Sequence, residues 1–263
     1  MGQYPIKAVR RATAGCGWAA ISVRLRLIMD LIVNSITSAL FFPRLPIENG
    51  VRFANAFIER TGNALDYEPM VLPLQQPAPP DAPRIVLRSR DRSFVCEFAL
   101  NRVNFHYYNQ NSPTQTLERF FPRYREALYR IISTLYEMTP DAPRRMGFVI
   151  KLIKAANRNS SEALQAEFLK TEAFDDAAES QMHFLHVLDL EGMKCNRWTR
   201  FRSIRMPNSE GPPRHILFEA DINTRADIER EYESNEAVSF FLEAYEHIRR
   251  QAESLLDFAN EES

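Results

Sequence analysis

The chain has 263 residues, 45% of them hydrophobic and 25% charged, which is typical of a globular protein with its own core and excludes disordered or fibrous classes. The 33 basic side chains nearly balance the 34 acidic ones, so no overall field attracts nucleic acid or an anionic membrane, and such binding needs a local patch. The three cysteines, Cys16, Cys96 and Cys195, match neither a disulfide framework nor a paired metal or redox motif, which predicts a reducing, cytoplasmic environment.

Residues 1–36 are predicted to be an N-terminal extension. The first 28 residues are basic, as in some targeting segments, but Asp30 interrupts the apolar run and no small-residue cleavage site follows it. No stretch reaches the roughly 20 apolar residues of a membrane span, so we expect no membrane association. Gly15, Cys16 and Gly17 match the letters of a dinucleotide fingerprint, but no apolar strand precedes them. No cofactor is predicted.

In the first half, residues 37–45 are predicted to form a strand, and residues 46–61 a helix that ends at Gly62. The helix is expected to bury one face, made of Val51, Ala54, Phe57 and Ile58. A proline cluster between residues 69 and 83 must be an extended connector. Residues 84–108 then alternate as three strands, and residues 114–138 form a helix with an internal boundary at Pro122.

The second half repeats this order. Residues 145–153 read as a strand and residues 160–170 as a helix, followed by three strands and a long helix from about Asn235. The three strands are expected at residues 181–190, 193–206 and 214–222. The last helix carries an apolar stripe at steps of three and four: Val238, Phe241, Tyr245, Ile248, Ala252 and Leu255. This stripe either docks on the sheet or forms the seam of a homodimer.

Both halves therefore follow the order strand, helix, three strands, helix, which indicates an internal duplication of residues 37–142 in residues 143–263. The predicted fold is of the α+β class, a broad antiparallel sheet with helices on one face. The saddle of the TATA-binding protein is the nearest analogy, and an analogy of fold does not carry function.

Several short segments resemble a sporadically distributed bacterial family of uncharacterised proteins of about this size. The resemblance covers residues 40–258 and rests on Asp91 and Arg92 and on three segments: Val103–Tyr107, Phe121–Tyr124 and Leu217–Ile222. His106 departs from the pattern, which has an aromatic residue such as Trp there. The family has no established activity, and its patchy distribution implies mobile-element or defence-linked genes.

The strand at residues 194–205 combines basic and aromatic side chains. Period-two alternation places five of them on one face: Lys194, Asn196, Trp198, Arg200 and Arg202. Trp and Arg are favoured anchors of protein interfaces, and the same set suits phosphate contacts and base stacking on DNA or RNA. In a purely structural interpretation, Glu219 and Asp221 pair with the arginines and Trp198 packs under a helix.

Two constellations invite a metal. His183 and His186 would be a metal pair on a helix, but on a strand they point to opposite faces. Asp189, Glu191 and Lys194 resemble a metal-dependent nuclease core, yet the lysine is one residue too far and Gly192 indicates a hairpin turn. No metal site is predicted.

In the absence of a catalytic signature, we predict a non-enzymatic binding or regulatory protein that acts through protein contacts, as a component of a bacterial defence or toxin-antitoxin type module. A DNA- or RNA-binding protein that uses residues 194–205 is the first alternative, and a metal-dependent nuclease is the second.

Overall fold

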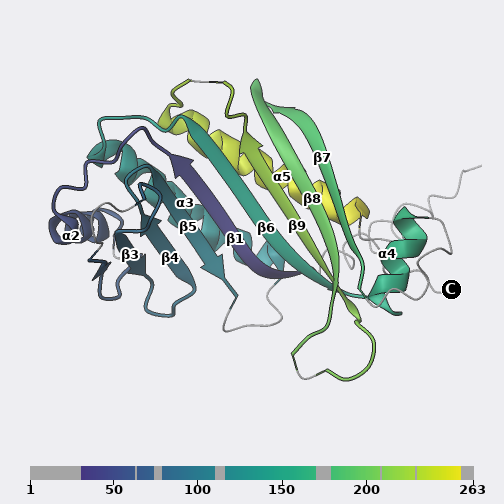
Figure 1. The fold of residues 1–263 in the computed structure, drawn as a ribbon. Coiled ribbons are helices and arrows are strands. Elements are labelled where there is room, and N and C mark those ends of the chain that lie inside the picture. Colours follow the sequence, from purple (N-terminus) through teal and green to yellow (C-terminus); the bar gives the residue numbers. More distant parts are fainter. Residues whose placement is uncertain are drawn as a thin grey trace, which may run out of the picture.

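The computed structural model describes residues 31–62, 64–73, 79–109, 116–169, 179–207, 209–228 and 230–255. Their strands form one antiparallel sheet in the order β2-β3-β4-β5-β1-β6-β9-β8-β7 (Figure 1). The first-half strands are β1 (Ile32–Phe41), β2 (Met70–Val71), β3 (Ile85–Arg88), β4 (Phe94–Phe98) and β5 (Arg102–Tyr108). The second-half strands are β6 (Arg145–Ala155), β7 (Gln181–Leu190), β8 (Met193–Ile204) and β9 (His215–Thr224). The helices of the described residues are α2 (Gly50–Arg60), α3 (Leu117–Met138), α4 (Ser160–Phe168) and α5 (Ser234–Leu255).

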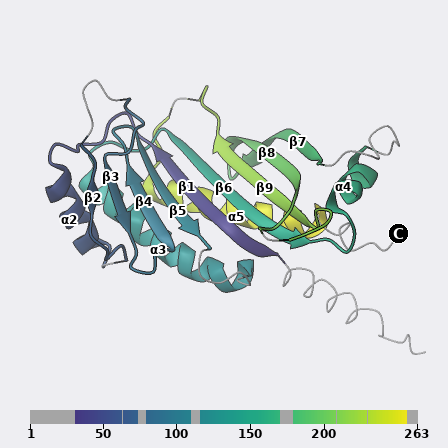
Figure 2. The same cartoon turned by 60° about the horizontal axis from the view of Figure 1, so that its bottom comes forward.

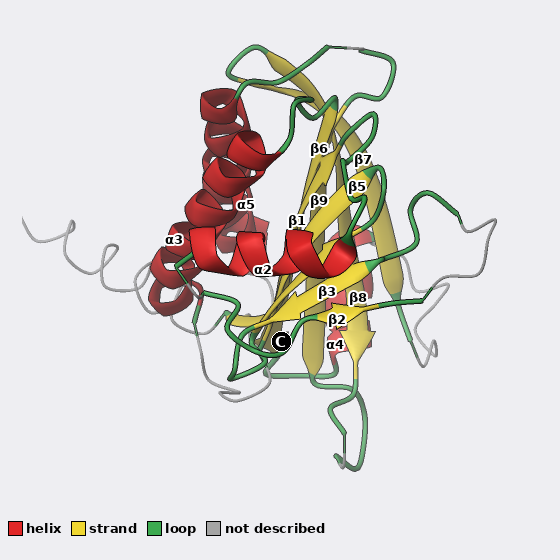
Figure 3. Cartoon of the chain, turned by 90° about the vertical axis from the view of Figure 1, so that its left-hand side faces the viewer, coloured by secondary structure: helices red, strands yellow, loops and turns green. Residues whose placement is uncertain are grey.

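These helices pack on one face of the sheet, because each strand turns alternate apolar side chains toward it. Helices α3 and α5 lie together on this side, and α5 crosses behind the strands (Figures 2 and 3). The rings of Phe121 in α3 and Tyr245 in α5 stack in parallel. The shorter helices contact the same face, through Phe57 of α2 on Phe98 and Phe168 of α4 on Phe201. The predicted α+β class and one-sided arrangement are confirmed.

The opposite face carries no helix within the described residues, and we call it the open face. Figure 1 looks onto it, with α5 behind the strands. A sheet with one solvated face shows buried and more exposed residues in alternation, and β8 does so along its whole length. The open face is therefore a large surface that the described helices leave available for contacts.

The centre of the sheet is the pair β1 and β6, which belong to different halves of the sequence. Outward from this pair the first half contributes β5, β4, β3 and β2, and the second contributes β9, β8 and β7. Apart from β2, which has no counterpart among the second-half strands, the order is symmetric about the centre. The duplication, with its boundary near residue 142, stays a prediction, and so does the analogy with the TATA-binding protein.

Three expectations about the first half were wrong in detail. Strand β1 begins at Ile32 rather than at residue 37, and the side chains of Val33 and Ile36 are fully buried, so part of the expected extension belongs to the sheet. In α2 the buried face is formed by Phe53, Ala54 and Phe57, whereas Val51 is 55% exposed. The helix begins only at Gly50, after the Asn49 cap accepts a hydrogen bond from Arg52.

Helix α3 also differs from the expectation of an internal boundary, since it runs without a break through Pro122. The proline lies in the second turn, where the helix loses only one backbone hydrogen bond.

The apolar stripe of α5 packs against the sheet, the first of its two expected arrangements. Phe241, Tyr245, Ile248 and Ala252 are at most 4% exposed, and Val238 is partly buried against the same core. These side chains are therefore not free to form a seam with a second copy. The side chain of Leu255 lies outside the described residues, as do Gly15, Cys16 and Gly17 and most of residues 1–36. No helix of the described part is both long and apolar enough to cross a bilayer.

Candidate functional site

The structure places all five side chains singled out on β8 on the open face. Arg202 and Lys194 are 53% and 56% exposed, Trp198 is 36% exposed, and Asn196 and Arg200 are partly buried. The alternation that places them there is fixed by the opposite set, since Cys195, Thr199 and Phe201 are buried toward the helices. Burial raises the pKa of the Cys195 thiol to about 12, so this side chain belongs to the core.

Arg200 is neutralised by acids of the neighbouring strand. Its guanidinium contacts the Glu219 carboxylate, its direct cross-strand partner, and lies 3.8 Å from Asp221. Lys151 of β6 reaches the other oxygen of Glu219 at 3.1 Å. The two cations and two carboxylates of this network cancel, so Arg200 is poorly suited to bind phosphate.

Asp221 lies beside this network, and burial raises the pKa of its carboxyl above the ordinary value, against the opposing effects of the Asn223 hydrogen bond and Arg200. Trp198 is its cross-strand partner and lies under the Arg200 guanidinium, whose carbon is 5.7 Å from the ring centroid. Among the described residues no helix covers the ring, so the expectation that it packs under a helix was wrong.

Trp198 also adjoins two exposed apolar side chains of β7. Leu185 is its direct partner across the hairpin, and Val187 pairs with Asn196 on the same face. Leu185 is 50% exposed and Val187 is 63% exposed. We call Leu185, Val187 and Trp198 the edge patch, because they lie where the sheet ends. Apolar side chains exposed in contact with one another are typical of an interaction surface.

The acids of the proposed nuclease core serve the β7–β8 turn instead. Asp189 accepts hydrogen bonds from the Gly192 amide at 2.7 Å and from the Lys194 ammonium at 2.7 Å, and the latter lowers its pKa. Glu191 accepts a hydrogen bond from Ser239 of α5. Glu191 and Gly192 both have positive φ, of 48° and 83°, the geometry of a two-residue type I′ hairpin turn.

No group of three metal-ligating side chains gathers among the residues that the structure describes. His183 and His186 lie on opposite faces of β7, as the alternation predicts.

A second cluster lies on the open face near the other end of the central strands. Phe41 of β1 pairs across the sheet with Arg102 of β5 and with Arg145 of β6. The two guanidinium carbons lie 6.0 and 5.1 Å from the centroid of the Phe41 ring. Within the described residues neither arginine has a carboxylate within ion-pair distance, although Arg102 makes a long hydrogen bond of 3.5 Å to the Asp81 carbonyl. This arginine pair was not expected, because only the pairing of β1 brings its members together.

A band of uncharged side chains separates the arginine pair from the charged network. It runs across five neighbouring strands, each residue paired with the next: Asn104, Ala39, Gly147, Asn223 and Asn196. A Cβ atom at position 147 would lie 2.6 Å from the Asn223 side-chain oxygen, so a larger residue there would force this asparagine side chain to move. The open face is therefore divided into an apolar edge, a neutralised centre and a cationic end.

The residues that carry the family resemblance have structural contacts. Asp91 accepts hydrogen bonds from Ser89 and Ser93 in the β3–β4 turn and from Arg123 of α3 at 2.9 Å. Burial acts to raise the pKa of this carboxyl, but the hydrogen bonds outweigh it and hold the pKa well below the usual range. His106 contacts Thr37 at 3.0 Å and Glu97 at 3.4 Å within the sheet. These motifs stabilise the fold, so they do not mark a site.

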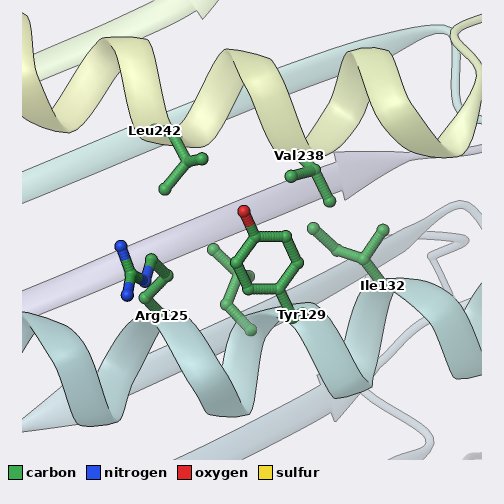
Figure 4. A pocket seen from close by; sticks show the side chains of 6 residues that line it. Arg125, Tyr129, Ile132, Val238 and Leu242 are labelled. Carbon is green, nitrogen blue, oxygen red and sulfur yellow. The ribbon is translucent and has the colours of Figure 1, made fainter.

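The space between α3 and α5 offers little room for a ligand. The apolar cavity between α3 and α5 is lined by Tyr129, Val238 and Leu242 among others (Figure 4). Its volume is about 10 Å³, enough for roughly one water molecule. Ligand pockets usually measure roughly 300–1,000 Å³, so this cavity is part of the helix packing.

Fold and site together define an α+β protein whose sheet is covered by helices on one side and presents a divided surface on the other. No protein-family model and no curated protein matches the chain. Among solved structures it is similar to a rolling circle replication initiator protein from Geobacillus stearothermophilus, with 10% identity over 83% of this chain and 80% of that one. The TM-score is 0.30, which is too low to indicate a shared fold.

Proposed function

We propose that this chain is a non-enzymatic binding protein that holds a protein partner against the β7–β8 end of its open face. The edge patch carries this proposal, since it exposes a tryptophan and two aliphatic side chains at one place. Tryptophan is the residue most enriched among interface hot spots, and neighbouring apolar contacts exclude water around it.

The charges beside the edge patch suit the same role. Arg202 lies on the same strand as Trp198, and among the described residues it forms an ion pair with Glu179 at 3.8 Å, whose side chain is 74% exposed. A pair this exposed contributes little and is easily exchanged for a carboxylate on a partner. The proposed partner therefore offers an apolar pocket for Trp198 with an acid placed near Arg202.

The test compares two aromatic side chains of equal exposure on opposite faces. Trp198→Ala removes the centre of the edge patch, and Tyr129→Ala removes an aromatic of α3 that is 37% exposed. The tagged chain is used to isolate its partner from the host, and the affinities of both variants for it are then measured. We expect Trp198→Ala to weaken binding by roughly 30-fold, about 2 kcal/mol, and Tyr129→Ala to leave it unchanged. Equal binding by both variants would contradict the proposal.

The cellular setting, a bacterial defence or toxin-antitoxin type module, follows from the family resemblance alone and stays a prediction. In such a module, the edge patch would be the surface that contacts the partner protein.

A second candidate function is binding of DNA or RNA, now placed at the arginine pair instead of at residues 194–205. Arg102 and Arg145 flank an aromatic ring and have no carboxylate within ion-pair distance among the described residues, whereas Arg200 is neutralised. Phosphate contacts and base stacking need this combination.

This candidate is tested with a labelled single-stranded oligonucleotide over a range of salt concentrations. The double variant Arg102→Ala, Arg145→Ala is expected to reduce the logarithmic salt slope by about 1.4, since each phosphate contact on a single strand contributes roughly 0.7. The variant Arg200→Ala is the control and is expected to leave the slope unchanged. Binding that does not depend on salt would exclude the candidate.

A further inference from the structure

The two edges of the sheet are built differently. Strand β2 forms one edge, contains only two residues, and is flanked by Pro69 and Pro73. Strand β7 forms the other edge and is ten residues long, with no proline, lysine or arginine. Short edge strands, prolines and cations are the devices that prevent edge-to-edge pairing. The β2 edge has such protection and the β7 edge does not, which indicates that β7 pairs with a strand of another chain.

The backbone of β7 has hydrogen-bonding groups available for this. The two-residue turn at Glu191 and Gly192 makes Leu190 and Met193 a hydrogen-bonded pair, so even-numbered residues of β7 direct their amides to β8. The Ser203 amide, which donates to the Ser180 carbonyl at 3.0 Å, continues the same phase. Odd-numbered residues from 181 to 189 therefore direct their N–H and C=O groups outward, and no described residue forms a backbone hydrogen bond with them.

The sequence of β7 is complementary to itself in one antiparallel register. Centred on His186, this register aligns side chains of the same face and, apart from the central histidine, opposes apolar with apolar and base with acid. The pairs are Met182 with Leu190, His183 with Asp189, Phe184 with Leu188, Leu185 with Val187, and His186 with its own copy. A shift of the centre to Leu185 would instead place His183 opposite Val187 and leave Asp189 opposite Gln181.

From these observations we infer that two copies of this chain join through their β7 edges, antiparallel and centred on His186, into one continuous sheet of both chains. The odd-numbered pairs of the junction are hydrogen-bonded, and the even-numbered pairs are not, as the outward direction of the odd-numbered amides requires. The two open faces lie on the same side of the joined sheet. Leu185 of each copy then lies opposite Val187 of the other, so the two edge patches form one surface.

This inference rests on the proposed function and extends it, because the dimer joins two edge patches into one larger surface for the captured partner. The homodimer it describes uses β7 and not the apolar stripe of α5, whose side chains are buried in the chain's own core.

The first measurement is the mass in solution by size-exclusion chromatography with light scattering over a range of concentrations. We expect a species of twice the 30.5 kDa chain mass for the native protein. The variant Leu185→Pro removes an outward amide without removing a hydrogen bond to β8, and it is expected to give the single-chain mass with an unchanged circular dichroism spectrum. A single-chain mass of the native protein at every concentration would overturn the inference.

A cross-linking test reads the register and does not depend on a destabilising variant. At a pair without hydrogen bonds the Cα atoms lie about 4.5 Å apart, within the range of roughly 4.4–6.8 Å that a disulfide bridges. His186→Cys, made with Cys16→Ser, is therefore expected to form a disulfide-linked dimer under mild oxidation. Leu185→Cys in the same background is the matched control, since its two copies are diagonal neighbours roughly 7–8 Å apart. Equal cross-linking of both variants would overturn the register.

The two proposals fail separately. A dimer that Trp198→Ala leaves intact while the captured partner is lost supports both. If Trp198→Ala loses the partner but the native protein forms no dimer, the proposed function stands and this inference is overturned. If a cross-linked dimer forms but no other protein is captured, this inference stands and the proposed function is overturned.

Discussion

Arg197 lies on the covered side of β8. The residue is 9% exposed, and its guanidinium contacts the Nε2 atom of His247 in α5 at 2.7 Å. Burial lowers the pKa of His247, and the charges of Arg197 and Arg250 lower it further. The imidazole is therefore neutral in the folded chain and accepts a hydrogen bond from Arg197. This is the contact through which pH acts most directly on the packing of α5.

The stability of the chain is expected to fall as the pH drops below about 6.5, the ordinary pKa of histidine. Below this pH the His247 imidazole binds a proton in the unfolded chain more readily than in the folded chain, so the free energy of unfolding decreases. His247→Gln keeps an acceptor for Arg197 and removes the titration. Between pH 7.5 and pH 5.5, urea unfolding should therefore show a smaller loss of stability for this variant than for the native chain. An equal loss in the native chain and in His247→Gln would contradict the assignment.

At the scale of elements, α5 is expected to act as a core helix. Ile248 is fully buried under the sheet, so Ile248→Ala should lower the free energy of unfolding by about 2–5 kcal/mol through lost burial and the cavity left behind. The variant should have the same mass in solution as the native protein, because this side chain faces its own sheet. Glu246→Ala, on the partly exposed side of α5, is the control and should cost less than about 0.5 kcal/mol. If Ile248→Ala unfolds no more easily than this control but changes the mass in solution, α5 would instead form the contact between two copies.

Local periodicity was sufficient to predict most elements. The second half was predicted closely, with β7 at its observed bounds, because its strands alternate cleanly and its helices have regular apolar steps. The start of β1 and the buried face of α2 were missed, since both depend on contacts with segments far along the chain. Alternation also predicted that the five β8 side chains share one face, and the acids of the next strand made the pairing of Arg200 with Glu219 predictable.

The remaining features of the open face could not be predicted from the sequence. The edge patch requires that β7 be the last strand of the sheet, and the arginine pair requires that β1 lie between β5 and β6. Both are facts of strand order, which no local pattern contains. Leu185 and Val187 read as ordinary alternating strand residues until their neighbours are known.

At the scale of the whole molecule, the sheet and its core run through both sequence halves without interruption. We therefore expect one cooperative unfolding transition. Cys96 in the first half and Cys195 in the second are both fully buried, and burial raises the pKa of each thiol. Pulse labelling with a thiol reagent along a urea series, read by mass spectrometry, should show both becoming reactive at the same midpoint. Separate midpoints would show that the halves unfold independently.

The central position of β1 has a consequence for how the protein is made. This strand precedes every other element of the sheet in the chain, yet Thr37 pairs with His106 on one side and with Val149 on the other. Closing such distant contacts is the slow part of folding for a sheet. During synthesis β1 leaves the ribosome long before either neighbour exists, with its apolar side chains exposed, and it is completed only when β6 has been translated. The strand at the heart of the finished sheet is thus the one that a nascent chain must protect for longest.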